Sequence, residues 1–263
     1  MNKLLHFSSR YVGYFFILVI LLICSNSQAK NKKIIMFGID HVIFKPDLSN
    51  IPGGWLGYMI GYTPSAIEND LFATIWGIPH PQTQHRQSTG PYSPILCHWL
   101  TVPNSSTFVR EKSIEYINQN TSLLRKTRLS LAAGYAFNPE KMAGVLKPNS
   151  DLLPIIHAVK RAGHHCIIAS NWNQECFYAL VKAHKSFLPL FETAYISGHL
   201  GYLTYEKPFF NKIVAELQAT PKDCILIDSR YESLMGAKKA GIKIITYNTG
   251  NQVMQELKQL YVI

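Results

Sequence analysis

The sequence predicts an α/β fold in which a parallel sheet is built from two separated parts of the chain, with a mostly helical insertion between them. After residue 148, short apolar runs alternate with amphipathic helical patterns. A further apolar run lies upstream at residues 33–39, and residues 47–147 break the alternation. Strands that alternate with helices are joined by right-handed crossovers and form parallel sheets. We therefore expect one α/β core and one insertion.

The first strand is predicted at residues 33–39, where an apolar run leads to Asp40. The insertion begins soon after it. Ser65 and Glu68 have the spacing of a capping box, which predicts the start of a helix that runs through Trp76.

Two more helices are predicted in the insertion, at residues 106–117 and 123–133. Residues 77–105 are rich in Pro, Gln, Ser and Thr, and they predict a long irregular segment between helices. Long loops are usually functional or disordered. A set of aromatic residues either lines a ligand cleft or packs in the interior: Trp55, Tyr58, Tyr62, Trp99 and Trp172.

The second part of the core starts where residues 149–151 offer capping side chains to a helix that ends at Gly163. The elements that follow are predicted as a strand at 166–169, a helix after Asn171, a strand at 195–196, a helix at 209–217, a strand at 224–227, a helix ending at Gly241, a strand at 242–247 and a helix at 253–260. Together with the first strand, these make five strands.

Polar residues and one glycine lie at or near the ends of several predicted strands. Gly38 and Asp40 lie at the end of the first strand, Ser170 follows the second, Lys207 lies beyond the third, and Asp228 follows the fourth. Ligands of parallel α/β sheets bind at the carboxyl ends of the strands. The topology alone therefore predicts that these residues surround one site.

Four segments, in this order, resemble the haloacid dehalogenase-like (HAD) phosphohydrolase superfamily. They are IIMFGIDHVIFKP at 34–46, KPNSDLLPIIHAVKRAGHHCIIASNW at 147–172, ISGHLGYLTYEKPFFNKIVAEL at 196–217 and ILIDSRYESLMGAKKAGIKIITY at 225–247. The resemblance implies a Rossmann-like, five-stranded parallel core with a mostly helical cap inserted after the first strand. The core is then residues 30–46 and 148–263, and the cap is residues 47–147.

The resemblance also implies the role of each residue at the site. Ser170 and Asn171 would bind a phosphate oxygen, and Lys207 would balance its charge. Asp228 would bind Mg²⁺. Asp40 would be the general acid and base, and its backbone carbonyl would also bind the metal.

This chain departs from the family pattern at the positions that matter most for chemistry. Gly38 occupies the place of the nucleophilic aspartate, which also binds the metal. Ser229 and Ser233 replace a common aspartate and a frequent asparagine, and His41 replaces a common glycine. Because Mg²⁺ prefers hard oxygen ligands, Asp228 alone predicts a weak or absent Mg²⁺ site.

A different register makes Asp40 the nucleophile. Val42 would then occupy the acid and base position, and no glycine would follow it. The register with Gly38 at the nucleophile position matches the family better.

Three functional hypotheses follow. In the first, the protein has a degenerate phosphatase site, with weak or no turnover, and still binds phosphate-type ligands. In the second, it is an active Mg²⁺-dependent phosphohydrolase that uses Asp40. In the third, it is an exported interaction module whose cap, residues 47–147, binds a protein partner.

The N-terminus has the pattern of a signal peptide over residues 1–29. Lys3 and Arg10 precede the apolar run FFILVILLIC at 15–24, and Ser27 and Ala29 are placed as the small residues of a cleavage site. We therefore expect an exported protein, periplasmic or secreted. In the alternative, residues 11–24 remain as a membrane anchor, although this run is shorter than the roughly 20 residues of a spanning helix.

The net charge of +10 comes from scattered basic residues, which argues against a nucleic-acid partner. His164 and His165 are adjacent in a strand and point to opposite faces, so a structural role is expected for them rather than a metal site. The cysteines that remain after cleavage lack metal-ligand spacing and are expected to be buried free thiols: Cys97, Cys166, Cys176 and Cys224.

Overall fold

A computed structural model describes residues 32–47, 64–78 and 90–263 of the chain. The expected signal peptide at 1–29, the alternative anchor at 11–24 and the aromatic residues Trp55, Tyr58 and Tyr62 lie outside these ranges. Residues 33–263 form one compact unit. No helix in the described ranges is both long and apolar enough to cross a membrane.

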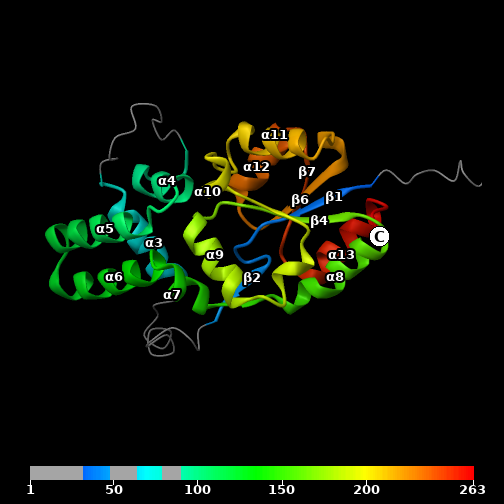
Figure 1. Ribbon diagram of the computed structural model, residues 1–263. Coiled ribbons are helices and arrows are strands. Elements are labelled where there is room, and N and C mark those ends of the chain that lie inside the picture. The colour runs from blue at the N-terminus through cyan, green and yellow to red at the C-terminus, as the bar shows by residue number, and fades with distance from the viewer. Residues whose placement is uncertain (1–31, 48–63, 79–89) are drawn as a thin grey trace, which may run out of the picture. The chain divides into compact units, whose positions relative to one another are not determined.

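The core is a five-stranded parallel sheet with the strand order β5-β4-β1-β6-β7 (Figure 1). Its strands are β1 (Ile34–Phe37), β4 (His165–Ser170), β5 (Ala194–Ile196), β6 (Cys224–Asp228) and β7 (Lys243–Thr246). β1 pairs in parallel with β4 on one side and with β6 on the other, so the strand nearest the N-terminus is central. This confirms the predicted fold class. Each strand is close to its predicted range, because buried parallel strands are continuous apolar runs.

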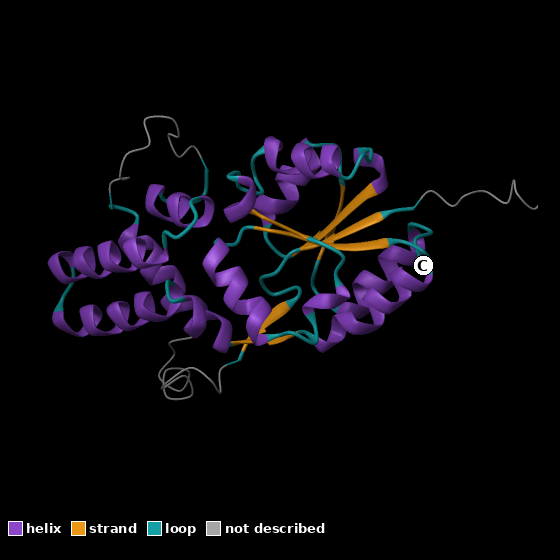
Figure 2. Ribbon diagram, in the orientation of Figure 1, coloured by secondary structure: helices purple, strands orange, loops and turns teal. Residues whose placement is uncertain are grey.

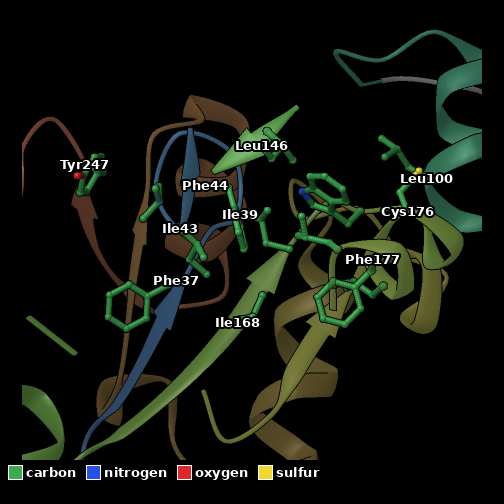
Figure 3. Packing of buried hydrophobic residues seen from close by; sticks show 14 of the residues in the cluster. Phe37, Ile39, Ile43, Phe44, Leu100, Leu146, Ile168, Cys176, Phe177 and Tyr247 are labelled. Carbon is green, nitrogen blue, oxygen red and sulfur yellow. The ribbon is translucent and has the colours of Figure 1, made fainter. Parts of the chain in front are cut away.

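Helices cover both faces of this sheet (Figure 2). On one face, alternate strand residues such as Ile35 and Ile168 pack with α8 (Leu153–Arg161), α9 (Gln174–Ala183) and α13 (Gly250–Gln259). Figure 3 shows part of this cluster, including Phe37 and Ile168.

On the other face, Met36 and Leu226 pack with α11 (Lys207–Glu216) and α12 (Tyr231–Lys239). The period of two along each strand accounts for the separation into two layers. The sheet is therefore a rigid frame, and its strand ends hold the loops that follow them.

The part of the insertion that the structure describes contains five helices between two short antiparallel strands, β2 (Phe44–Pro46) and β3 (Leu146–Pro148). The helices are α3 (Pro64–Ile75), α4 (Pro94–Thr101), α5 (Ser106–Asn120), α6 (Leu123–Ala136) and α7 (Pro139–Gly144). α5 and α6 are where the sequence predicts them. α3 begins at Pro64, which places the expected cap Ser65 inside the helix.

The prediction of an irregular segment over residues 77–105 is wrong for its last part, which contains α4. Pro94 starts this helix at a position where the missing N–H costs nothing. The apolar run that follows buries Ile95, Leu96 and Trp99. The burial of these apolar side chains stabilises a short helix within a segment whose composition otherwise favours loops. β2, β3 and α7 are likewise too short for periodicity to reveal.

Asn173 connects the insertion to the core. Its Oδ1 caps α9 by accepting from the backbone N–H groups of Glu175 (2.9 Å) and Cys176 (3.2 Å), and it also accepts from Ser106 Oγ (3.1 Å). Its Nδ2 donates to the carbonyl oxygen of Trp99 (2.7 Å). One fully buried side chain therefore joins the start of α9 to α4 and α5.

His164 and the cysteines are buried in the interior. His164 Nδ1 accepts from the Lys33 backbone N–H (3.0 Å), and its Nε2 lies 2.9 Å from the carbonyl oxygen of Val262. The Val262 contact makes Nε2 the protonated nitrogen. The four cysteines in the described ranges are buried and free. Burial raises the thiol pKa of Cys166 and Cys176 to about 12, so these thiols are unreactive.

Candidate functional site at the carboxyl ends of the strands

The loops that follow β1, β4 and β6 converge, and they bring three of the predicted site residues together. Ser170 is the last residue of β4, and its Oγ accepts from the backbone N–H of Ile39 in the loop after β1 (3.2 Å). Asp228 is the last residue of β6 and is 2% exposed. Asp40 follows β1 and contributes to the pKa shift of Asp228 through its charge. The site is therefore centred on Asp40, Ser170 and Asp228.

The Asp228 carboxylate occupies the space that a side chain on Gly38 would need. A Cβ placed on Gly38 would lie 2.6 Å from Asp228 Oδ2, 2.7 Å from its Cγ and 2.9 Å from its Oδ1. Gly38 itself is held in the sheet, since its N–H donates to the carbonyl oxygen of Ile227 (2.9 Å). Any larger residue at position 38 must displace this carboxylate.

Burial makes Asp228 a much weaker acid than an exposed aspartate. Burial raises its pKa to about 7, and the nearby charge of Asp40 acts in the same direction. The backbone N–H of Arg230 donates to Asp228 Oδ1 (2.9 Å) and partly offsets this shift. At neutral pH, Asp228 is therefore divided between the neutral and the charged form.

Asp40 is surrounded by positive charge. Its side chain is 31% exposed, but its crowded surroundings raise its pKa through desolvation. The charges of Arg230 and His41 oppose that rise. His41 has a φ of 60°, which explains why a glycine is common at this place in the resembling family.

Arg230 and Glu68 belong to the site, and the sequence analysis assigned neither of them to it. The Arg230 guanidinium has one nitrogen, Nη2, 3.7 Å from Asp40 Oδ2 and 3.7 Å from Glu68 Oε1. Glu68 is on α3 of the insertion, so Arg230 lies between a core carboxylate and an insertion carboxylate. The sequence does contain a signal for Arg230, because this residue comes two positions after Asp228, in the loop at the carboxyl end of β6.

Asn171 makes structural contacts at the edge of the site. Its Oδ1 accepts from the backbone N–H of Thr204 (2.8 Å), and its Nδ2 donates to the Tyr92 hydroxyl (3.4 Å). Tyr92, from the insertion, stacks on Tyr205 of the core with ring centroids 6.1 Å apart. Asn171 thus connects the loop after β4 to the insertion and to the loop before α11.

Trp172 places an unpaired donor beside Asp40. The side chain is 3% exposed, and its Nε1 has no hydrogen-bond partner in the part of the chain that the structure describes. The indole nevertheless lowers the pKa of Asp40, so it lies near that carboxylate without forming a regular hydrogen bond to it. A buried donor without a partner is costly, and a ligand atom is one way to satisfy it.

Lys207 does not join the group of carboxylates. It is the first residue of α11, its side chain is exposed, and within the described ranges it has no ion pair. The preceding loop is fixed by a bond between Thr204 Oγ1 and Ser233 Oγ (2.7 Å). A Cβ on Gly236 would lie 1.8 Å from the Thr204 carbonyl oxygen, so the loop rests directly on α12.

The oxygen atoms that the resemblance assigns to Mg²⁺ have other partners. Ser229 Oγ donates to the Asp40 carbonyl oxygen (3.1 Å), and the Arg230 N–H bonds Asp228. Gly38 offers no side-chain ligand. Across residues 32–47, 64–78 and 90–263, no three His, Cys, Asp or Glu side chains are grouped so as to hold a metal ion.

Solved structures with the same arrangement of strands and helices are HAD-like hydrolases. A predicted HAD-like family hydrolase from Porphyromonas gingivalis matches with a TM-score of 0.55 at 12% identity, covering 88% of this chain and 98% of that one. A HAD family enzyme from Bacteroides thetaiotaomicron, in complex with magnesium and inorganic phosphate, has a TM-score of 0.52 at 16% identity, over 83% and 96%. The chain has a HAD-like fold.

The HAD-like fold is also that of L-2-haloacid dehalogenase from Xanthobacter autotrophicus, which matches with a TM-score of 0.52 at 13% identity, over 88% of this chain and 84% of that one. Neither a scan against protein-family models nor a search of curated protein sequences finds a match. At these identities, the comparisons establish the fold. The function must be argued from the residues at the site.

Proposed function

We propose that this HAD-fold protein binds a small phosphate-type ligand at the carboxyl ends of its strands and has weak or no phosphohydrolase activity. The observation that carries the proposal is the contact between Gly38 and Asp228. An aspartyl-phosphate route needs a carboxylate nucleophile at the end of β1. Gly38 has no side chain, and the carboxylate of Asp228 fills the space where one would begin.

The proposal includes a weak or absent Mg²⁺ site. A HAD neighbour is in complex with magnesium and phosphate, so Mg²⁺ dependence is plausible for this fold. The residues of this chain fit the ion poorly, because position 38 offers no oxygen and the Asp40 carbonyl already accepts from Ser229. Mg²⁺ demands near-ideal octahedral oxygen geometry, which one buried carboxylate with a raised pKa does not supply.

Donors at the site favour an anionic ligand. Trp172 offers a buried N–H that has no partner within the described ranges, and Arg230 offers a guanidinium on a side chain that is 39% exposed. Ser170 Oγ, in contact with the Ile39 N–H, brings a hydroxyl to the same strand end. Phosphate oxygens are acceptors for each of these groups. Phosphate-type ligands are consistent with the phosphate complex of the Bacteroides enzyme.

Calorimetric titration with inorganic phosphate and a parallel assay of aryl phosphate hydrolysis test the proposal. We expect saturable phosphate binding and little or no turnover with or without Mg²⁺. Robust Mg²⁺-dependent turnover would refute the impaired chemistry. The absence of phosphate binding under all conditions would refute the ligand.

An active phosphohydrolase that uses Asp40 is the second candidate, because Asp40 is partly exposed beside Arg230 while Asp228 is buried. In that case the Asp40→Asn variant loses turnover and Gly38→Ser does not abolish it. Equal residual activity in Asp40→Asn and in the natural protein would exclude this candidate.

We also propose that the protein is exported, to the periplasm or outside the cell. The support is the charge pattern, apolar run and small-residue cleavage site within residues 1–29. Mass spectrometry of the mature protein tests it, with a new N-terminus near Lys30 as the expected result. A full-length chain in the membrane fraction would instead support an anchor over 11–24.

A further inference from the structure

We propose that Arg230 is the residue that supplies positive charge to the bound anion, so that the site binds phosphate without a metal ion, and that Glu68 of the insertion competes with the ligand for this guanidinium. The inference rests on the proposed ligand binding and deepens it. It assigns the charge of the site to a side chain that the family resemblance does not mention.

The main chain around Arg230 is fixed. The residue follows β6 directly, and its backbone N–H donates to Asp228 Oδ1 (2.9 Å). Asp228 is in turn immobilised at the end of a central strand, where it is almost fully buried. The guanidinium therefore extends from a rigid point into the site, as a preorganised ligand-binding group requires.

The side chain of Arg230 is loosely paired. Its Nη2 is 3.7 Å from both Asp40 and Glu68, which is longer than a hydrogen bond. A guanidinium carries five N–H donors in a planar fork that matches the spacing of two phosphate oxygens. Two distant carboxylates leave most of this capacity unused, and the 39% exposure makes it accessible.

Other donors face the same space. The Trp172 Nε1 is buried, has no hydrogen-bond partner among the described residues and lies near Asp40, which Arg230 also approaches. Ser170 Oγ lies at the same strand end, where it accepts from the Ile39 N–H and keeps its own hydroxyl hydrogen as a donor. A tetrahedral oxyanion accepts from the indole N–H and from this hydroxyl.

Lys207 forms no ion pair with Asp40 or Asp228 within the described ranges. Its side chain is exposed, and it is absent from the charges that shift the pKa of Asp40 and Asp228. Arg230 heads the charges that lower the pKa of Asp40 and of Glu68. Arg230 therefore supplies the largest positive charge at the site, and His41 adds a smaller one.

Glu68 makes the site sensitive to the insertion. It reaches Arg230 from α3, and its Oε1 is 3.7 Å from Arg230 Nη2, the same nitrogen that Asp40 approaches. A phosphate that binds the guanidinium bidentately takes over the interactions that Glu68 makes with it. Removing the Glu68 charge should therefore strengthen phosphate binding, whereas removing the Arg230 charge should weaken it.

The test is calorimetric titration of inorganic phosphate into the natural protein in buffer with EDTA, beside Arg230→Gln, Arg230→Lys and Glu68→Gln. We expect Arg230→Gln to weaken binding by about tenfold or more, because charge-assisted hydrogen bonds are lost. Arg230→Lys should retain part of the affinity, and Glu68→Gln should bind several-fold more tightly. The matched controls are Arg161→Gln and Glu111→Gln, exposed residues on α8 and α5 that should bind like the natural protein.

Thermal melting without phosphate shows that each variant is folded. If the natural protein binds phosphate only when Mg²⁺ is added, or if Arg230→Gln binds as well as the natural protein, the role of Arg230 is refuted while phosphate binding stands. If the natural protein binds no phosphate with or without Mg²⁺, the proposed function falls and this inference falls with it.

Discussion

The contact between Gly38 and the Asp228 carboxylate predicts a strong energetic coupling between these two positions. In Gly38→Ala, the new Cβ would begin 2.6 Å from Asp228 Oδ2, against an ordinary contact distance of 3.4 Å or more. The carboxylate must therefore move by about 1 Å. That movement strains its bond from the Arg230 N–H, which is 2.9 Å long and lies in a buried setting.

Overpacking of a tight core typically costs about 1–3 kcal/mol, and a hydrogen bond to a charged group is worth a similar amount. We expect Gly38→Ala to lower the free energy of unfolding by about 2 kcal/mol, which in a domain of this size lowers Tm by roughly 4–8 °C. In the Asp228→Ala background the obstacle is absent, and the same substitution should cost little. The coupling energy of the cycle should therefore be about 2 kcal/mol.

Urea denaturation of the two single variants and the double variant measures this cycle. Gly134→Ala is the matched control, because a Cβ there meets no atom within 4 Å. An alanine at this position, in the last turn of α6, should stabilise the protein by up to about 1 kcal/mol. If Gly38→Ala costs the same with and without the Asp228 carboxylate, that carboxylate does not fill the space and the argument for an obstructed nucleophile position is wrong.

Three further predictions follow from buried or strained groups. Because the folded-state pKa of Asp228 is raised to about 7 from an ordinary 3.8, its stabilising contribution is complete below pH 4 and is lost as the pH rises through 7. In EDTA, the free energy of unfolding of Asp228→Asn should therefore rise by roughly 2–3 kcal/mol relative to that of the natural protein between pH 5 and pH 8. Parallel pH profiles of the two proteins would contradict this. His41 has a φ of 60°, so His41→Gly should be tolerated. His41→Val should lower the free energy of unfolding in urea by about 1–2 kcal/mol, because a β-branched side chain is strained in this backbone conformation. Equal stabilities of the two variants would show that the loop relaxes. Asn173→Ala should lower the free energy of unfolding by about 2–4 kcal/mol, because it removes the α9 cap and the 2.7 Å hydrogen bond to the Trp99 carbonyl oxygen. Hydrogen exchange of this variant should show faster opening of α4 and α5.

The residues at the site decide which screen suits this protein. Activity screens of this protein with Mg²⁺ and phosphate esters test only the chemistry that Gly38 makes least favourable. Binding screens without metal, with Arg230→Gln as the reference, test the property that the side chains at the site favour.

Much of the fold was predictable because it depends on short-range patterns. The runs at 33–39, 166–169 and 224–227 are strands because continuous apolar residues bury both faces of a parallel sheet, and this requires no knowledge of their neighbours. Asp40, Ser170 and Asp228 each follow such an apolar run, so the sequence predicts that they lie at strand ends. The structure brings those three ends together.

Other features depend on contacts between residues far apart in the sequence. α4 forms within a loop-like composition because its apolar side packs on the interior of the insertion. Lys207 begins a helix at the expected place, yet its side chain is exposed, and helical periodicity does not determine where a terminal side chain points.

The sequence by itself determined the α/β class, the position of most strands and the absence of a carboxylate at position 38, because these follow from local periodicity and residue identity. Only the tertiary structure decided that the Asp228 carboxylate fills the space beside Gly38 and that Arg230 lies between Asp40 and Glu68. Glu68 and Arg230 are 162 residues apart by number (230 − 68), and no local pattern encodes their approach. The packing of the insertion and the rotamers of buried carboxylates set it, and these depend on the whole folded chain.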